Sequence, residues 1–207
     1  MIEKITFVFA KTIDIFISID TQEAKKILEY DVNIDKFGRA IEDICLKIVS
    51  LQRPYASDLR AVTGYLKVVS DFERIGDHCS DICEIVSMGN LESSKFDCYQ
   101  KTIYILKKVG DSFNKISEAC VKLDVDTARE IFLLDDEVDD MFSEIITNIS
   151  DSISNRIINN VYMASDLMFI AKYAERIGDH CVNISKWIVY MKLGFFPKLK
   201  FFTQNIN

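Results

Sequence analysis

Apolar side chains recur at helical spacing along almost the whole chain of 207 residues. Over residues 57–88 the apolar positions follow alternating steps of four and three, which is the spacing of a helix that packs one stripe into a bundle. Residues 159–193 repeat this series. Further helical patterns cover residues 3–29, 32–53, 94–123 and 126–154. The pattern predicts an all-α protein with six long helices.

One block of seven residues occurs twice in the sequence. The run Glu-Arg-Ile-Gly-Asp-His-Cys stands at 73–79 and again at 175–181, a shift of 102 residues from position 73 to position 175. Farther upstream the pair Ile19-Asp20 matches Leu123-Asp124 at a shift of 104 residues, which a two-residue length difference in an intervening turn explains. A repeat this long indicates a duplication. We therefore predict two tandem antiparallel three-helix bundles, with domains at 1–90 and 91–207.

The two ends of the chain depart from this symmetry. The first helix is shorter than its counterpart, because Met1 aligns with Ile105 whereas the fourth helix begins near Ser94. Gly194 ends the last helix. Four phenylalanines follow it, Phe195, Phe196, Phe201 and Phe202. We expect this tail to pack onto the bundle, with a contact to a partner as the alternative.

Composition and charge narrow the classes of function. With 49% hydrophobic residues the chain can bury a full core, and a net charge of −7 disfavours nucleic acid as a partner. The apolar stretch from Ile5 to Ile19 is interrupted by Lys11 and Asp14, so we expect no membrane span and at most a peripheral contact with a membrane. No signal peptide is recognisable. We expect a cytoplasmic protein whose six cysteines are reduced thiols.

Acidic side chains form rows on the third predicted helix of each copy. Glu73, Asp77 and Asp81 are spaced at i, i+4 and i+8, so they share one helix face. The second copy places Glu175 and Asp179 at the equivalent positions, followed by Asn183. A row of acids opposite a core stripe is also typical of a solvated helix face.

The second predicted helix of each copy opens with another acidic pair, Asp31 with Asp35 and Asp135 with Asp139. In an antiparallel hairpin, residues equally far from the turn lie at one height, since each helix rises about 1.5 Å per residue. In the first copy the midpoint between the two acidic pairs is Pro54, and in the second it lies at position 157, within the Asn-rich run 155–160. In both hairpins, the acidic pair of the second helix should therefore lie at the same height as the acidic pair of the third helix.

Four level carboxylates repel one another unless a positive charge lies among them. Arg74 and Arg176 could supply it, but a bound cation fits the spacing better, because a residue one step along a helix points about 100° away. Oxygen ligands suit hard cations, and carboxylates also bind iron, so the candidate ions are Fe, Mn, Mg, Ca and Zn. The predicted ligands are Asp31, Asp35, Glu73, Asp77, Asp81, Asp135, Asp139, Glu175 and Asp179.

Residues next to these acids refine the hypothesis. Glycine, not histidine, stands three residues after Glu73 and after Glu175, so the Glu-x-x-His pair of a di-iron oxidase is missing. His78 and His180 are either ligands or outer donors to the ion, or simply solvated. Gly76 and Gly178 cost about 1 kcal/mol each in a helix. They indicate a close approach by another helix or by the ion.

These motifs resemble the PhoU family of phosphate-uptake regulators. The resemblance depends on the doubled Glu-Arg-Ile-Gly-Asp-His block, on the run from Arg53 to Arg60, and on the acidic pairs of the second helices. It implies two three-helix bundles, and metal clusters held by paired acidic motifs, which would be the acids named above except Asp81. It further implies a cytoplasmic, often dimeric, negative regulator that couples the ATPase subunit of an ABC phosphate transporter to a sensor histidine kinase.

Two other interpretations stay open at this point. One is a metal-dependent phosphohydrolase, in which the carboxylates and two ions activate water. The other is a structural helical bundle whose acids are solvated and bind no metal. We find no nucleophile motif and no glycine-rich phosphate loop in the sequence, so we expect a protein that is not an enzyme.

Overall fold

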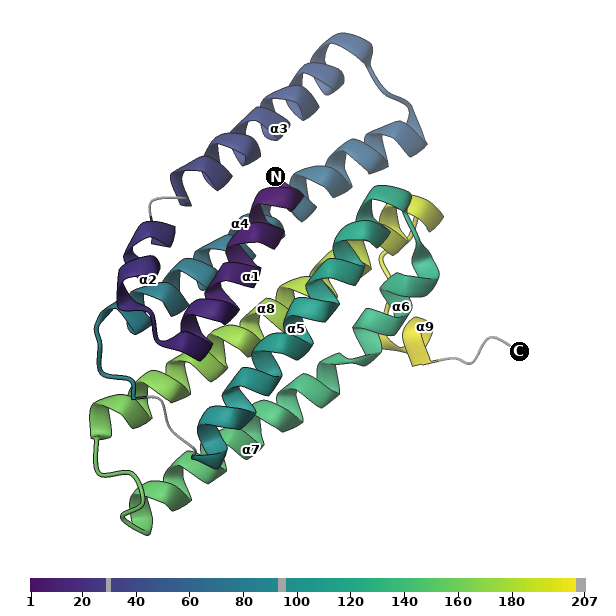
Figure 1. Ribbon diagram of the computed structural model, residues 1–207. Helices are drawn as coiled ribbons and strands as arrows, with labels where there is room; N and C mark the ends of the chain where they lie inside the picture. The colour runs from purple at the N-terminus through teal and green to yellow at the C-terminus, as the bar shows by residue number, and fades with distance from the viewer. Residues whose placement is uncertain (29–30, 93–95, 204–207) are drawn as a thin grey trace.

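The computed structural model describes residues 1–28, 31–92 and 96–203, without the side chains of 31–33 and 199–200. Helices account for all the regular structure in these ranges (Figure 1). They are α1 (Ile2–Ser18), α2 (Thr21–Leu28), α3 (Asp31–Gln52), α4 (Ala56–Ser87), α5 (Asp97–Lys122), α6 (Val125–Leu133), α7 (Asp135–Ser154), α8 (Val161–Leu193) and α9 (Leu199–Thr203). The predicted all-α fold is confirmed, and α1–α4 and α5–α8 are its two copies.

The predicted helix 3–29 is wrong, because the chain turns at Ile19. This residue is left-handed, with φ at 53°, and it ends α1. The Asp20 carboxylate then accepts hydrogen bonds from the N–H groups of Gln22 and Glu23, which starts α2. In the second copy Leu123 has φ at 51° and Asp124 caps α6. The match between Ile19-Asp20 and Leu123-Asp124 therefore marked a helix break.

The predicted helix 126–154 is also interrupted. Its α-helical hydrogen bonding stops at Leu134, whose N–H donates to the Ile131 carbonyl three residues back. The helix α7 then begins at Asp135. Each copy consists of three helical segments, which we call its arms. The second arm is a short helix followed by a long one, α2 with α3 in the first copy and α6 with α7 in the second (Figure 1). Each copy still has three arms, as the duplication predicted.

The helices α4 and α8 lie in the middle of the molecule and run antiparallel to each other (Figure 1). Their predicted stripes are buried, from Val68 to Val86 in α4 and from Met163 to Ile188 in α8. Side chains from both copies form one continuous hydrophobic core. The domain boundary at 90/91 stays a prediction, since this shared core joins the two copies.

Two glycines let the second arm approach the central helix closely. A Cβ atom on Gly76 would lie 2.9 Å from the Cδ1 atom of Ile34, and one on Gly178 would lie 3.3 Å from the Cγ1 atom of Val138. Ile34 and Val138 occupy equivalent positions of the repeat, and both are buried. Close helix packing therefore explains these two glycines, and it brings α3 onto α4 and α7 onto α8.

The first copy is more open than the second. Its α1 has 17 residues against 26 in α5, so the predicted shortening is confirmed. A cavity of about 430 Å³ lies between the start of α1 and the apolar side chains of Ile41, Tyr65 and Phe72. On α3, Ile44 and Leu46 are more than half exposed.

The C-terminal tail packs onto α6, as predicted, through one of its phenylalanines. Phe202 is 2% exposed, and its ring stacks on Phe132 with 3.6 Å between the ring centres. Arg129 donates a hydrogen bond to the Phe201 carbonyl and lies over the Phe201 ring. Phe195 and Phe196 are about half exposed. Within the described residues, we find no helix with the length and apolar character needed to cross a bilayer.

Candidate functional site

The acids of the second copy come together as the sequence predicted. We call Asp135, Asp139, Glu175 and Asp179 the second acidic quartet. Burial raises the pKa of Asp135 to about 6, with further contributions from the charges of Asp179 and Asp139. Burial and the neighbouring Glu175 charge raise the pKa of Asp139 as well. The two rows on α7 and α8 therefore face each other at the same height.

Two lysines lie near this quartet, Lys172 and Lys186, and neither was predicted from the sequence. Lys172 precedes Glu175 by one helical turn and donates a hydrogen bond to its Oε1 atom at 2.6 Å. The Lys172 charge also counteracts the raised pKa of Asp139 and of Asp179. Glu175 is well buried, with a side chain 13% exposed. The i, i+3 spacing of Lys172 and Glu175 was the signal that could have revealed this pair.

The first acidic quartet consists of Asp31, Asp35, Glu73 and Asp77. The side chain of Asp31 lies outside the described residues. The pKa of Glu73 is raised by burial first, then by the charges of Glu42, Asp35 and Asp77. A side chain on Gly38 would occupy the space of the Glu73 carboxylate, so this glycine makes room for it. The three carboxylates that the structure describes, those of Asp35, Glu73 and Asp77, therefore lie near one another.

Positive charge at the first quartet comes from two arginines. Arg39 Nη2 lies 3.9 Å from Asp35 Oδ2, and Arg74 Nη1 lies 3.1 Å from Asp77 Oδ2. Arg74, one of the two arginines named as an alternative to a bound cation, thus does pair with an acid of the quartet. Arg176, its equivalent in the second copy, makes no ion pair with any residue that the structure describes. Its guanidinium group instead borders a pocket.

The two quartets differ in their surroundings. Glu42 joins the first quartet, whereas the equivalent position of the second copy is Ile146. Lys172 lies at the second quartet, whereas its equivalent is Ser70. The two sites thus have different charged neighbours, an added acid and two arginines at the first and two lysines at the second. A difference in charge of this kind favours a difference in affinity for cations.

The chemistry of these donors fits a hard cation. Both quartets offer carboxylate oxygens, which magnesium, calcium and manganese ions prefer. Their raised pKa values reflect burial first and mutual repulsion second, and a cation would offset both effects. As they stand, no three acidic, histidine or cysteine side chains of the described ranges are close enough to hold an ion. Binding would require the carboxylates to turn inward. The metal assignment of the two quartets stays a prediction.

The two histidines lie at the contact between the copies. His78 comes from α4 and His180 from α8, and their ring centres are 5.6 Å apart. His78 Nδ1 is 3.2 Å from Asp81, and His180 Nδ1 is 2.9 Å from Asp71. His78 is buried, so the alternative of a solvated side chain is wrong for it. Asp81, a predicted ligand, contacts this histidine, and its role as a metal ligand stays a prediction.

Equivalent positions of the repeat meet across this contact. Asp71 of α4 binds His180 of α8, while Tyr173 of α8 stacks on His78 of α4 with 5.4 Å between the ring centres. Positions 71 and 173 are equivalent, as are 78 and 180. The antiparallel helices α4 and α8 are therefore related by a local twofold axis. Sequence periodicity predicted that both helices pack into a bundle but could not reveal that they face each other.

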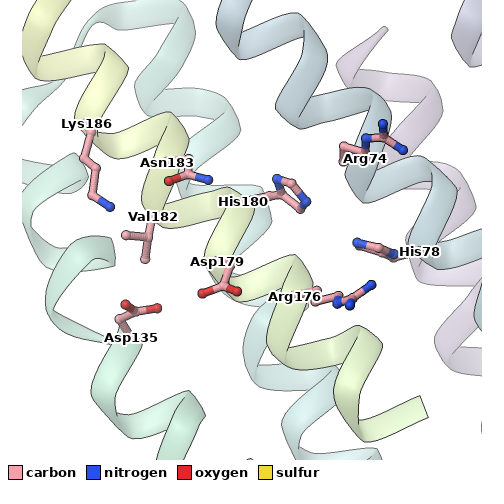
Figure 2. A pocket seen from close by; sticks show the side chains of 9 residues that line it. All are labelled: Arg74, His78, Asp135, Arg176, Asp179, His180, Val182, Asn183 and Lys186. Carbon is pink, nitrogen blue, oxygen red and sulfur yellow. The ribbon is translucent and has the colours of Figure 1, made fainter. Parts of the chain in front are cut away.

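A pocket of about 450 Å³ opens beside the histidines, which we call the α4–α8 pocket. Figure 2 shows Arg176 and His180 extending from α8 toward α4, and His78 extending from α4 toward α8. The residues that line the pocket are Arg74, His78, Asp135, Arg176, Asp179, His180, Val182, Asn183 and Lys186. Two acids of the second quartet thus form one side of a pocket whose other side is basic.

Comparisons with known proteins agree with the fold and its repeat. A crystal structure of PhoU from Pseudomonas aeruginosa superposes with a TM-score of 0.88 at 24% identity, over 94% of this chain and 93% of that one. The phosphate transport system regulatory protein PhoU from Streptococcus pneumoniae gives a TM-score of 0.87 at 23% identity, over 96% and 92%. At these identities the likeness establishes the fold alone.

Sequence comparison gives the family. The phosphate-specific transport system accessory protein PhoU of Escherichia coli is 31% identical over 84% of this chain and 72% of its own length. A homologue from Thermotoga maritima is 31% identical over 93% of this chain and 84% of its own. The PhoU domain profile matches twice, at residues 1–86 and 105–188. Since these two matches cover both copies of the repeat, the chain belongs to the PhoU family.

Proposed function

We propose that this protein is a metal-binding negative regulator of phosphate uptake and of phosphate-starvation signalling. It acts in the cytoplasm as a homodimeric adaptor between the ATPase subunit of an ABC phosphate transporter and a sensor histidine kinase. The observation that supports this best is the PhoU match over both copies, together with relatives named as accessory proteins of the phosphate-specific transport system. The proposed role involves no catalysis.

The metal part of the proposal depends on the two acidic quartets. Asp135 and Asp139 on α7 would hold the ion together with Glu175 and Asp179 on α8, and the first quartet would do so between α3 and α4. The raised pKa values of Asp135, Asp139 and Asp179 support this, because burial and neighbouring charges disfavour the ionised form of each carboxyl. A bound ion would neutralise this charge and tie the second arm to the central helix.

Metal analysis tests this directly. We expect the purified protein to contain or take up Mn²⁺ or Fe, and added Mn²⁺ to raise its melting temperature. The double variant Asp77→Asn, Asp179→Asn should lose both effects. Asp151→Asn, which removes an exposed carboxylate elsewhere on α7, is the matched control and should behave as the wild type. Equal, negligible metal content in all three proteins would leave a structural bundle with solvated acids.

The regulatory part needs a separate test in cells. Deletion of the gene should derepress the phosphate-starvation response in phosphate-rich medium, and expression of the wild-type chain should restore repression. Unchanged expression of the phosphate-starvation genes after the deletion would contradict the proposal. Hydrolysis of a phosphoester by the Mn²⁺-loaded protein, lost in Asp77→Asn, would favour the phosphohydrolase instead. Light scattering of the purified chain tests the dimer.

A further inference from the structure

The α4–α8 pocket concentrates positive charge in a protein that is acidic as a whole. Arg74, Arg176 and Lys186 line it, against two acids, whereas the chain carries a net charge of −7. The basic residues come from both central helices. Cationic side chains that converge on one cavity can attract and hold an anion.

Three carboxylates outside the pocket lining pair with residues that line it. Asp77 binds Arg74, Asp81 binds His78, and Asp71 binds His180. Arg176 is different, since within the described ranges its guanidinium group has no hydrogen bond and no ion pair. Figure 2 shows its side chain reaching from α8 into the space toward His78. Its five N–H donors are therefore available to a ligand in the pocket.

The two histidines add hydrogen-bonding atoms of fixed orientation. Each ring is held through Nδ1 by an aspartate, and the Nε2 atoms make no hydrogen bond among the described residues. A neutral ring that donates through Nδ1 presents Nε2 as an acceptor. A phosphate monoanion or monoester at neutral pH can carry a hydroxyl group as well as charged oxygens. The arginine donors and the histidine acceptors together suit such an anion.

We propose that the α4–α8 pocket binds an anion of the phosphate class, with Arg176 as its principal ligand and with Arg74, His78 and His180 around it. Arginine matches this class because its planar guanidinium group donates two parallel hydrogen bonds to a tetrahedral oxyanion. At about 450 Å³ the pocket has the size of a small-molecule site, so the anion is either free phosphate or the phosphoryl group of a small molecule.

This inference goes beyond the proposed function and does not depend on bound metal. Titration calorimetry of the full chain in EDTA, at constant ionic strength, should give saturable binding of inorganic phosphate or of adenosine monophosphate. Tighter binding of the monophosphate would assign the pocket to a phosphorylated small molecule, and tighter binding of inorganic phosphate would assign it to free phosphate. Either result supports the anion site.

Arg176→Gln should weaken this binding about ten-fold or more, which is the loss expected for hydrogen bonds to a charged group. The control Arg156→Gln removes an exposed arginine outside the pocket lining and should bind like the wild type. Equal melting temperatures of the two variants would exclude misfolding. Absence of saturable binding to the wild type, or binding that survives Arg176→Gln, would overturn the proposal. So would binding that requires Mn²⁺, because the ion would then hold the phosphate.

Discussion

The charge of Asp135 should destabilise the metal-free protein, so Asp135→Asn should stabilise it at neutral pH. The pKa of this carboxyl is raised from 3.8 to about 6 in the folded state. Each pKa unit is worth about 1.4 kcal/mol, so the full difference would be roughly 3 kcal/mol. Asp135 is partly exposed and starts helix α7, and both solvent and the helix dipole offset part of this cost. We expect a gain of about 1–2 kcal/mol.

The sign of the pH dependence follows from the direction of the shift. The folded pKa lies above the unfolded one, so the folded state binds the proton more tightly, and ionisation removes stability as pH rises from about 4 to 7. Urea unfolding in EDTA should therefore show wild type and Asp135→Asn equally stable below pH 3.5 and separated at pH 7.5. Trp187 fluorescence would report the transition.

The same substitution should have the opposite effect when metal is present. A ligand at 100 times its dissociation constant stabilises a protein by about 2.7 kcal/mol, and Asp135→Asn should lose much of this gain. Asp136→Asn is the control, because it removes an exposed charge from the same helical turn and should change stability by less than about 0.5 kcal/mol. An Asp135→Asn variant that is less stable than the wild type at pH 7.5 in EDTA would refute the reasoning.

Three other experiments, each based on one main substitution, test the fold and the site. Gly76→Ala should destabilise by about 1 kcal/mol in chemical denaturation, although alanine normally stabilises a helix, and the added change Ile34→Val should restore part of the loss. Phe202→Ala should cost about 2 kcal/mol, while Phe196→Ala should cost less than half of that; equal costs would contradict the observed packing. Lys172→Met should lower stability in EDTA by about 1 kcal/mol and increase the stabilisation by Mn²⁺ in thermal melts; a smaller response to the ion would count against a site there.

The heights of the acidic pairs could be predicted because they depend only on helix geometry and on the position of a turn. Asp135 faces Asp179 and Asp139 faces Glu175, as two helices that are antiparallel about residue 157 require. The predicted core stripes are buried for the same reason, since apolar periodicity fixes which side of a helix packs inward.

Helix periodicity could not predict where the chain turns between helices or which charged side chains pair across the two copies. Ile19 and Leu123 are apolar residues in a left-handed conformation that side chains of this kind rarely adopt, so only the aspartate after each of them marks the new helix. The positions of His78 and His180 depend on how the two copies pack, which involves contacts more than 100 residues apart in the chain. Periodicity within one helix carries no information about such contacts.

The antiparallel contact of α4 with α8 has the form of an isologous interface, in which one surface meets a second copy of itself. A single repeat on its own would present this surface as a homodimer, whose two halves must be identical. Joining the repeats in one polypeptide removes that restriction. Asp71 opposite His180 and Tyr173 opposite His78 are therefore possible together, as are Asp81 and Asn183, and the fused chain can keep a symmetric scaffold while its two faces specialise.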